Sequence, residues 1–105
     1  MEITSFDWDR GNIIKCQKHG VEISDIEGFF KGQNYSVLKD VLHSNLEPRY
    51  LAIGQLKSGR HVLVVFTIRL VGIGLAVRPI SARYMHDKEI HHYETRIEKA
   101  TSTEK

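Results

Sequence analysis

An uninterrupted apolar run, Val62–Phe66, constrains the fold of this chain more than any other feature. A strand that is apolar on both faces has to be covered from both sides. The run therefore predicts the central strand of a sheet, within the segment His61–Leu70. Gly59 precedes this segment at a position where a tight hairpin turn needs positive φ, and Gly72 and Gly74 mark a second turn after it. We therefore expect an antiparallel neighbour on each side.

Alternation of residues between two faces, with Phe6 and Trp8 on one of them, predicts a short strand at Ile3–Trp8. The other expected strands are Tyr35–Leu42, Tyr50–Leu56 and Leu75–Ala82. Pro79 lacks an amide hydrogen, which places the last of them at a sheet edge or at a bulge. With the helices described below, the order β-α-α-β-β-β-β-α predicts an α+β fold. Its antiparallel sheet has about four strands, with two N-terminal helices and one C-terminal helix.

The first helix is expected to run from the N-cap Asp9 to about Lys18. Asp9 is suited to accept from the unpaired amides of the first turn. Gly20 is placed to end the helix in a left-handed turn. Ile13 and Ile14 supply the expected apolar side.

The second helix is predicted from a capping box and an apolar face. Ser24 can accept from the amide of Glu27 while the Glu27 side chain reaches back. The apolar face repeats at helical spacing and consists of Ile26, Phe29 and Phe30. Gly32 is expected to close the helix.

The third helix is expected from about His86 to Lys99. Its apolar seam, at helical spacing, is Ile90, Tyr93 and Ile97. The polar residues Ala100–Lys105 are expected to form a frayed tail after a single domain of residues 1–99.

Composition limits the classes of function. The chain has 105 residues, and its 15 Lys and Arg against 13 Asp and Glu give a net charge of +2, which permits a local nucleic-acid patch without arguing for one. The single cysteine, Cys16, excludes an internal disulfide and fits a reducing cytoplasm. Neither a membrane helix nor a secretory signal is expected.

Two blocks of sequence are more specific than this pattern. The first comprises Phe6–Asp9, Asn12, Lys15-Cys16 and Lys18–Val21, and the second comprises Arg78–Arg83 followed by Glu89 and Tyr93. In this order and spacing the chain resembles the BrnT family from Phe6 to Glu94. Arg49-Tyr50, Ile53-Gly54 and Gly59-Arg60 also match.

The resemblance implies a fold similar to the RelE toxins and a ribonuclease that stops translation and needs no cofactor. It also implies an antitoxin partner, usually a ribbon-helix-helix protein that would form a 2:2 complex. RNA would be the substrate, free or on the ribosome. The chain departs from the family at three positions. Many members carry Lys and Asn where Asn12 and Cys16 stand, and an aliphatic residue where Pro79 stands.

Metal-independent RNA cleavage needs a base, a cation for the charge on phosphorus, and an acid. Arg83 is the first choice for the phosphate, because a planar guanidinium holds two phosphate oxygens at once. Alternatively, Arg83 is a surface residue paired with Asp87 or Glu89. Three weaker candidates for RNA binding are Arg49, Arg60 and Arg78; Arg49 could equally pair with Glu47.

His19 is the candidate for proton transfer, because histidine titrates near neutrality. The neighbouring Lys15 and Lys18, which are also expected to contact RNA, would lower the pKa of His19 and favour a base. Alternatively, His19 binds the last carbonyls of its helix.

Glu89 and Tyr93 are four residues apart, so they share a helical face on which Glu89 could orient Arg83. In the other interpretation, which we favour for Tyr93, this tyrosine belongs to the core and Glu89 is an ordinary salt-bridge partner. Trp8 could stack on a base, although a strand tryptophan is more often part of the core.

A metal site is not expected. His86, His91 and His92 have a spacing that matches no common zinc site, and Cys16 is expected to be an inert packing residue. Two other functions stay open: a non-catalytic module that serves mainly as the partner of the antitoxin, and a small metal-dependent hydrolase.

Overall fold

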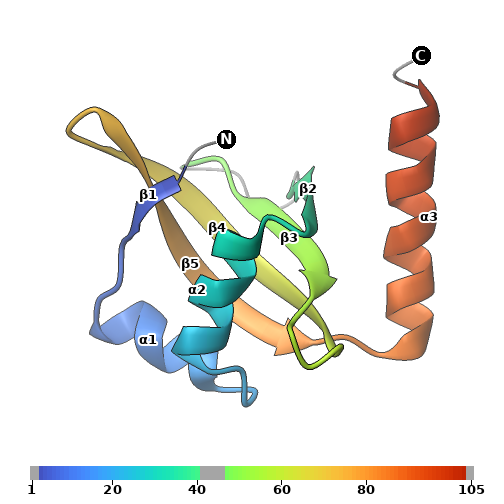
Figure 1. The fold of residues 1–105 in the computed structure, drawn as a ribbon, viewed down its shortest axis with the longest axis horizontal. Helices are drawn as coiled ribbons and strands as arrows, with labels where there is room; N and C mark the ends of the chain where they lie inside the picture. The colour runs from blue at the N-terminus through green and yellow to red at the C-terminus, as the bar shows by residue number, and fades with distance from the viewer. Residues whose placement is uncertain (1–2, 41–46, 104–105) are drawn as a thin grey trace.

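The computed structural model describes residues 3–40 and 47–103, with the backbone alone for 100–103. Its elements are β1 Ile3–Phe6, α1 Arg10–Gln17, α2 Ile23–Gly32, β2 Tyr35–Lys39, β3 Tyr50–Gln55, β4 His61–Val71, β5 Gly74–Tyr84 and α3 Asp87–Thr103 (Figure 1). The α+β prediction is confirmed. None of the helices in this described part is long and apolar enough to cross a membrane.

The strands form one sheet in the order β1-β5-β4-β3-β2, so β4 is central, as the apolar run predicts. Strands β2 to β5 are antiparallel neighbours. β1 adds a fifth strand and pairs with β5 in parallel, which makes the sheet mixed. The alternation within a strand carries no information on its direction relative to a distant partner, so the sequence predicted only the antiparallel part.

One face of the sheet is covered by α1 and α2, and we call it the α1–α2 face (Figure 1). Its buried residues include Val62, Val64 and Phe66 from β4. Phe30 of α2 is in contact with four aromatic rings at centroid distances of 5.1–6.1 Å. These rings are Phe6, Phe29, Tyr35 and Phe66. This aromatic cluster is the centre of the core.

The opposite face carries a smaller apolar cluster, and we call it the α3 face. Its buried residues are Leu51, Ile53 and Leu63, against which Tyr93 of α3 packs. Because β4 contributes side chains to both clusters, its apolar run is apolar on both faces. Figure 1 shows α3 standing beside the sheet, on the side away from α1 and α2.

The ends of α1 follow the prediction, but its buried side does not. Asp9 caps the helix and accepts from the amide of Asn12, whose side chain accepts from the Asp9 amide. Ile14 is 61% exposed, whereas Asn12 and Cys16 are buried. The prediction of an apolar side formed by Ile13 and Ile14 is therefore wrong for Ile14, whereas Ile13 is half-buried. The helix packs on the sheet through a side that also makes hydrogen bonds.

The predicted capping box of α2 is wrong, while its apolar face is confirmed. The helix begins at Ile23, and Glu22 at the N-cap makes no side-chain cap. Glu27 is not available for a box, because its carboxylate accepts from Trp8 Nε1 at 2.9 Å. The helix ends at Gly32, but the left-handed residue is Gln33, with φ 57°.

Pro79 lies at a bulge rather than on an edge strand. β5 has neighbours on both sides, β1 and β4. Val65 pairs with Ser81 and Phe66 pairs with Pro79, so Ile80 is an extra residue between the two pairs. The bulge alternative is confirmed, because a residue without an amide hydrogen fits where the ladder is interrupted.

The other bounds shift by a few residues. β1 ends at Phe6, two residues early, because the chain turns there toward the N-cap of α1. β5 extends to Tyr84 and α3 extends to Thr103. The predicted strand end at Leu42 falls outside the described residues.

Gly54 of β3 supports a first prediction, on stability. A Cβ at this position would lie 2.6 Å from the Asn34 carbonyl oxygen and 3.1 Å from Tyr35 Cα, both backbone atoms that cannot rotate away. We expect Gly54→Ala to lower the free energy of unfolding by about 1–3 kcal/mol in urea denaturation.

The matched control is Gly28→Ala in α2, where a Cβ would meet nothing within 4 Å. There the same substitution removes a flexible residue from a helix and should raise stability by about 0.5–1 kcal/mol. Equal effects at the two positions would contradict the steric argument.

Candidate functional site

An arginine–glutamate pair lies where β5 leads into α3. Arg83 pairs across the sheet with Leu63, so its side chain is on the α3 face. Its Nη1 donates to Oε1 of Glu89 at 2.7 Å, and its Nη2 donates to Oε2 at 2.5 Å. Arg83 lies inside β5, which ends at Tyr84, and not after the strand as predicted. The predicted role of Glu89 in orienting Arg83 agrees with this geometry.

The pair is charged and partly open to solvent. The hydrogen bond from Arg83 lowers the pKa of Glu89, and the bond to Glu89 raises the pKa of Arg83. The side chains of Arg83 and Glu89 are 40% and 23% exposed. A bidentate pair through Nη1 and Nη2 engages one hydrogen on each, so the Nε–H edge of the guanidinium can still donate to another oxygen.

Tyr93 lies one helical turn after Glu89. It is half-buried and packs against Leu51, Ile53 and Leu63. This agrees with the interpretation of Tyr93 as a core residue, which the sequence favoured. It is close enough to Arg83 to contribute to the raised pKa of that guanidinium. Tyr93 therefore forms the apolar side of the Arg83–Glu89 cluster.

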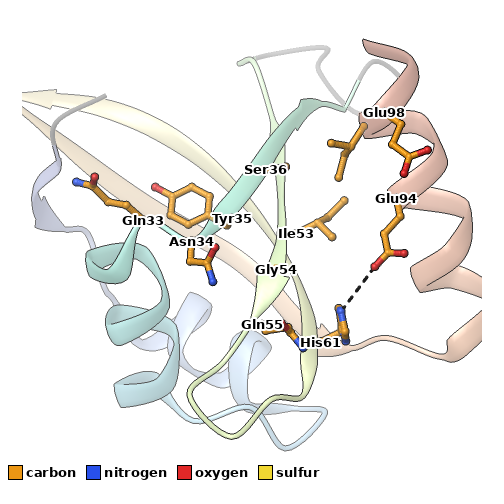
Figure 2. Close-up of a pocket in the computed structure, with 11 residues that line it drawn as sticks. Gln33, Asn34, Tyr35, Ser36, Ile53, Gly54, Gln55, His61, Glu94 and Glu98 are labelled. Carbon is orange, nitrogen blue, oxygen red and sulfur yellow. Dashed lines mark ion pairs between the residues drawn. The ribbon is translucent and has the colours of Figure 1, made fainter. Parts of the chain in front are cut away.

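His61, the first residue of β4, is absent from the set predicted by sequence. Its Nε2 lies 3.9 Å from Oε1 of Glu94 in α3 (Figure 2). Leu63 pairs with Arg83, and the Met85 amide donates to the His61 carbonyl at 3.1 Å. His61 and Arg83 are thus diagonal neighbours on the α3 face, with Cα atoms roughly 7–8 Å apart.

Side chains alternate between the two faces of a strand, so the strand predicted over His61–Leu70 places His61 and Leu63 on one face. This is the signal that could have found His61. It becomes informative only with the hairpin register that sets Arg83 opposite Leu63. That register includes a bulge, which the sequence predicted only as one of two alternatives for Pro79.

A groove of about 410 Å³ opens beside this cluster, between α3 and the strands β2 and β3, and we call it the α3 groove (Figure 2). His61 and Glu94 lie at one part of it, and Ile53 and Ile97 form apolar walls. The other residues that line it are Gln33, Asn34, Tyr35, Ser36, Gly54, Gln55 and Glu98.

The candidates on and after α1 are not brought together with Arg83. Lys15, Lys18 and His19 are exposed, and α1 lies on the α1–α2 face. Within the described residues no hydrogen bond or ion pair joins His19 to Arg83 or Glu89. Arg83, Lys18 and His19 therefore do not line one groove in this fold.

Arg78 and Trp8 are engaged in structural contacts. Arg78 is only 18% exposed and its Nη2 donates to Oδ2 of Asp9 at 2.7 Å. The Asn12 amide and the Arg78 side chain together lower the pKa of Asp9. Trp8 is half-buried and its indole N–H donates to Glu27. These contacts connect the segment at the start of α1 to β5 through Arg78 and to α2 through Glu27.

The two remaining arginine candidates lie apart from the Arg83 cluster. The Arg60 guanidinium carbon lies 3.4 Å from the centroid of the Tyr84 ring, a residue on the α1–α2 face. Arg49 precedes β3 and its carbonyl accepts from the Asp40 amide. Glu47, considered as its partner, lies 3.7 Å from Arg69.

Metal ligands do not cluster in the described part of the chain: it holds no group of three or more His, Cys, Asp or Glu that could hold a metal ion. His92 packs edge-on against the ring of Tyr93. Burial raises the pKa of Cys16 to about 11, so this thiol is protonated at neutral pH.

The three departures from the family pattern lie in the contact between α1 and β5. The Asn12 side-chain amide donates to the carbonyls of Asp7 at 2.9 Å and Pro79 at 2.8 Å. Cys16 is buried in the core cluster on the same helix. All three therefore concern the attachment of α1, and none belongs to the Arg83–Glu89 pair.

The lowered pKa of Glu89 gives a second prediction. The folded-state pKa lies below the usual value of 4.5, so the pair stabilises the fold above that value and loses its effect as pH falls through the folded-state pKa. We expect Glu89→Gln to lower the free energy of unfolding by up to about 1 kcal/mol at neutral pH, because the pair is partly exposed.

Urea denaturation at about pH 7 and about pH 3 checks this: the difference between the two proteins should be largest at the first pH and smaller at the second. A difference of the same size at both pH values would assign the effect to packing. The exposed Glu22→Gln serves as control.

The fold and the site together define a small α+β protein with an arginine-centred polar cluster on one face of its sheet. Residues 8–89 match the family described as the ribonuclease toxin, BrnT, of a type II toxin–antitoxin system. The chain belongs to this family, as its sequence blocks indicate. A type II system implies an antitoxin partner. A comparison with curated proteins gave no match.

Proposed function

We propose that this chain cleaves RNA without a metal ion, at the cluster formed by Arg83, Glu89 and His61. The observation that carries the proposal is the bidentate Arg83–Glu89 pair on an accessible sheet face. A guanidinium fixed in orientation before the substrate arrives can stabilise charge as it develops on phosphorus. The family membership supports the reaction class.

The reaction needs no group beyond the RNA and protein side chains. The ribose 2′-oxygen loses its proton and bonds to phosphorus, the bond from phosphorus to the 5′-oxygen breaks, and that oxygen takes up a proton. The products are a 2′,3′-cyclic phosphate and a 5′-hydroxyl. Arg83 would donate from its Nε–H edge to a phosphate oxygen while Glu89 holds its other edge.

Proton transfer is assigned to His61. It shares the α3 face with Arg83, which supports this assignment over His19 on the other side of the sheet. Nε2 of His61 lies 3.9 Å from Oε1 of Glu94, so the two side chains face each other across this part of the α3 groove. Lys15, Lys18 and His19 would then contribute a basic surface for a longer RNA.

In the cell, the proposed result is inhibition of translation by loss of RNA, free or on the ribosome. Neutralisation is assigned to a ribbon-helix-helix antitoxin that dimerises and holds two copies of this chain. The cytoplasm is the proposed place of action, because both substrate and translation are there.

One observation favours a second function, a non-catalytic module that binds the antitoxin. Glu89 occupies both terminal nitrogens of Arg83 and competes with a phosphate for them. A decayed toxin would keep this pair closed and retain only the partner surface.

The test is incubation of the purified chain with RNA in excess EDTA, followed by analysis of the new ends. The enzyme predicts fragments ending in 2′,3′-cyclic phosphate, and their loss in a folded Arg83→Ala variant. Arg69→Ala is the control, since Arg69 is similarly exposed but pairs with Asp7 and Glu47. Intact RNA with the folded chain would favour the binding module, and cleavage that EDTA abolishes would favour a metal-dependent hydrolase.

A further inference from the structure

The chemistry of the α3 groove differs from that of an RNA-binding surface. Two glutamates of α3, Glu94 and Glu98, line it, and Figure 2 shows both on the helix side of the opening. Among the described residues that line it, none is Lys or Arg. A phosphate backbone lying along Glu94 and Glu98 would meet two carboxylates, with the His61 imidazole at one part of the groove as the one candidate cation among the described lining residues. Like charges brought together cost affinity.

The same groove suits a peptide. Ile53 of the sheet and Ile97 of α3 give it two apolar walls, and Glu94 and Glu98 add negative charge beside them. A Lys or Arg flanked by apolar side chains matches both properties at once. Charge complementarity therefore selects a cationic, partly apolar segment of protein as the occupant.

The position of β2 adds a backbone argument. β2 is the last strand in the sheet order and pairs with β3. Its Tyr35 and Ser36 line the groove. An edge strand offers main-chain donors and acceptors to an extended segment, which can add to the sheet as a further strand.

We propose that the α3 groove is the docking site of the antitoxin, filled by an extended antitoxin segment. A Lys or Arg of that segment faces Glu94, and apolar side chains lie between Ile53 and Ile97. The inference rests on the proposed function, since it names the partner of the same site. The docked segment covers His61, which adjoins Arg83, so binding and neutralisation are one event.

Cysteine footprinting tests the site directly. The native Cys16 is buried with a raised pKa, so it reacts slowly with thiol reagents. Ser36→Cys puts a reactive group in the groove, and Ser24→Cys puts one at an exposed position of α2 as the matched control. The probe is the purified cognate antitoxin. At about 100 times its Kd it should slow alkylation at position 36 roughly 100-fold and leave position 24 unchanged.

Charge reversal gives a second measurement. Glu94→Arg should weaken antitoxin binding by about 30-fold or more, because it places two cations together. Glu22→Arg makes the same change on the exposed start of α2 and should leave the Kd unchanged. Circular dichroism of both variants separates loss of binding from loss of fold.

Three results would overturn the inference: no binding of the antitoxin to the unaltered chain, equal alkylation at position 36 with the antitoxin bound, or protection of that position by RNA or by a second copy of the chain alone. Neither measurement uses RNA cleavage. A chain that docks the antitoxin here but cuts no RNA would leave this inference standing and overturn the ribonuclease proposal.

Discussion

Arg83→Lys is expected to lower the rate of RNA cleavage about 100- to 1000-fold, in the range found when a single preorganised donor to a developing charge is lost. Lysine keeps the positive charge but loses the planar fork, so it cannot hold Glu89 and a phosphate oxygen on two edges at once. The measurement is the single-turnover rate of cleavage of one RNA by each protein. Stability should change little, because an exposed ion pair contributes at most about 1 kcal/mol.

Arg69→Lys is the matched control for this prediction, because Arg69 also forms ion pairs with carboxylates but lies outside the site. Its cleavage rate should equal that of the unaltered chain. If Arg83→Lys cleaves at the unaltered rate as well, charge alone suffices at this position and the bidentate geometry has no catalytic role.

Phe30→Ala is expected to lower the free energy of unfolding by about 3–5 kcal/mol, the largest effect on stability anticipated for a single side chain here. Phe30 is 1% exposed and its ring is in contact with Phe6, Phe29, Tyr35 and Phe66. Its loss leaves a cavity that these rings line. The total stability of a domain this size is about 5–15 kcal/mol, so the variant would be close to unfolding.

Urea denaturation followed by circular dichroism measures this change. Ile14→Ala also truncates an apolar side chain, but Ile14 is exposed, and the effect should stay within about 0.5 kcal/mol. A loss below about 1 kcal/mol for Phe30→Ala would mean that α2 is not held by this cluster.

The parts of the fold that sequence predicted are those with an apolar period of their own. The run in β4 and the spacing of Ile26, Phe29 and Phe30 each report burial locally, and the structure buries them as expected. The prediction of the buried side of α1 was wrong for the opposite reason. The buried residues of α1 include Asn12, whose side chain donates to the carbonyl of the nearby Asp7 and to that of the distant Pro79. Hydrophobicity favours Ile14 there, and it carries no information on those acceptors.

The residues of the candidate site also separate into those that local sequence could predict and those that depend on tertiary structure. Arg83 and Glu89 are six residues apart at a strand–helix junction, so their contact is local and could be anticipated. His61 reaches the cluster through a hairpin register that contains a bulge. His19 was placed with Arg83 by chemistry alone, because the face of the sheet that α1 occupies is set by tertiary packing.

The hydrogen bond from Asn12 to the Pro79 carbonyl has a consequence for which side chains position 12 can hold. Asn12 is 5% exposed, so a lysine at this position could reach the same carbonyl only by burying its charge. The accepting oxygen belongs to the backbone and is present whatever residue stands at position 79. The residue at position 12 is therefore expected to decide whether this link between α1 and β5 can form.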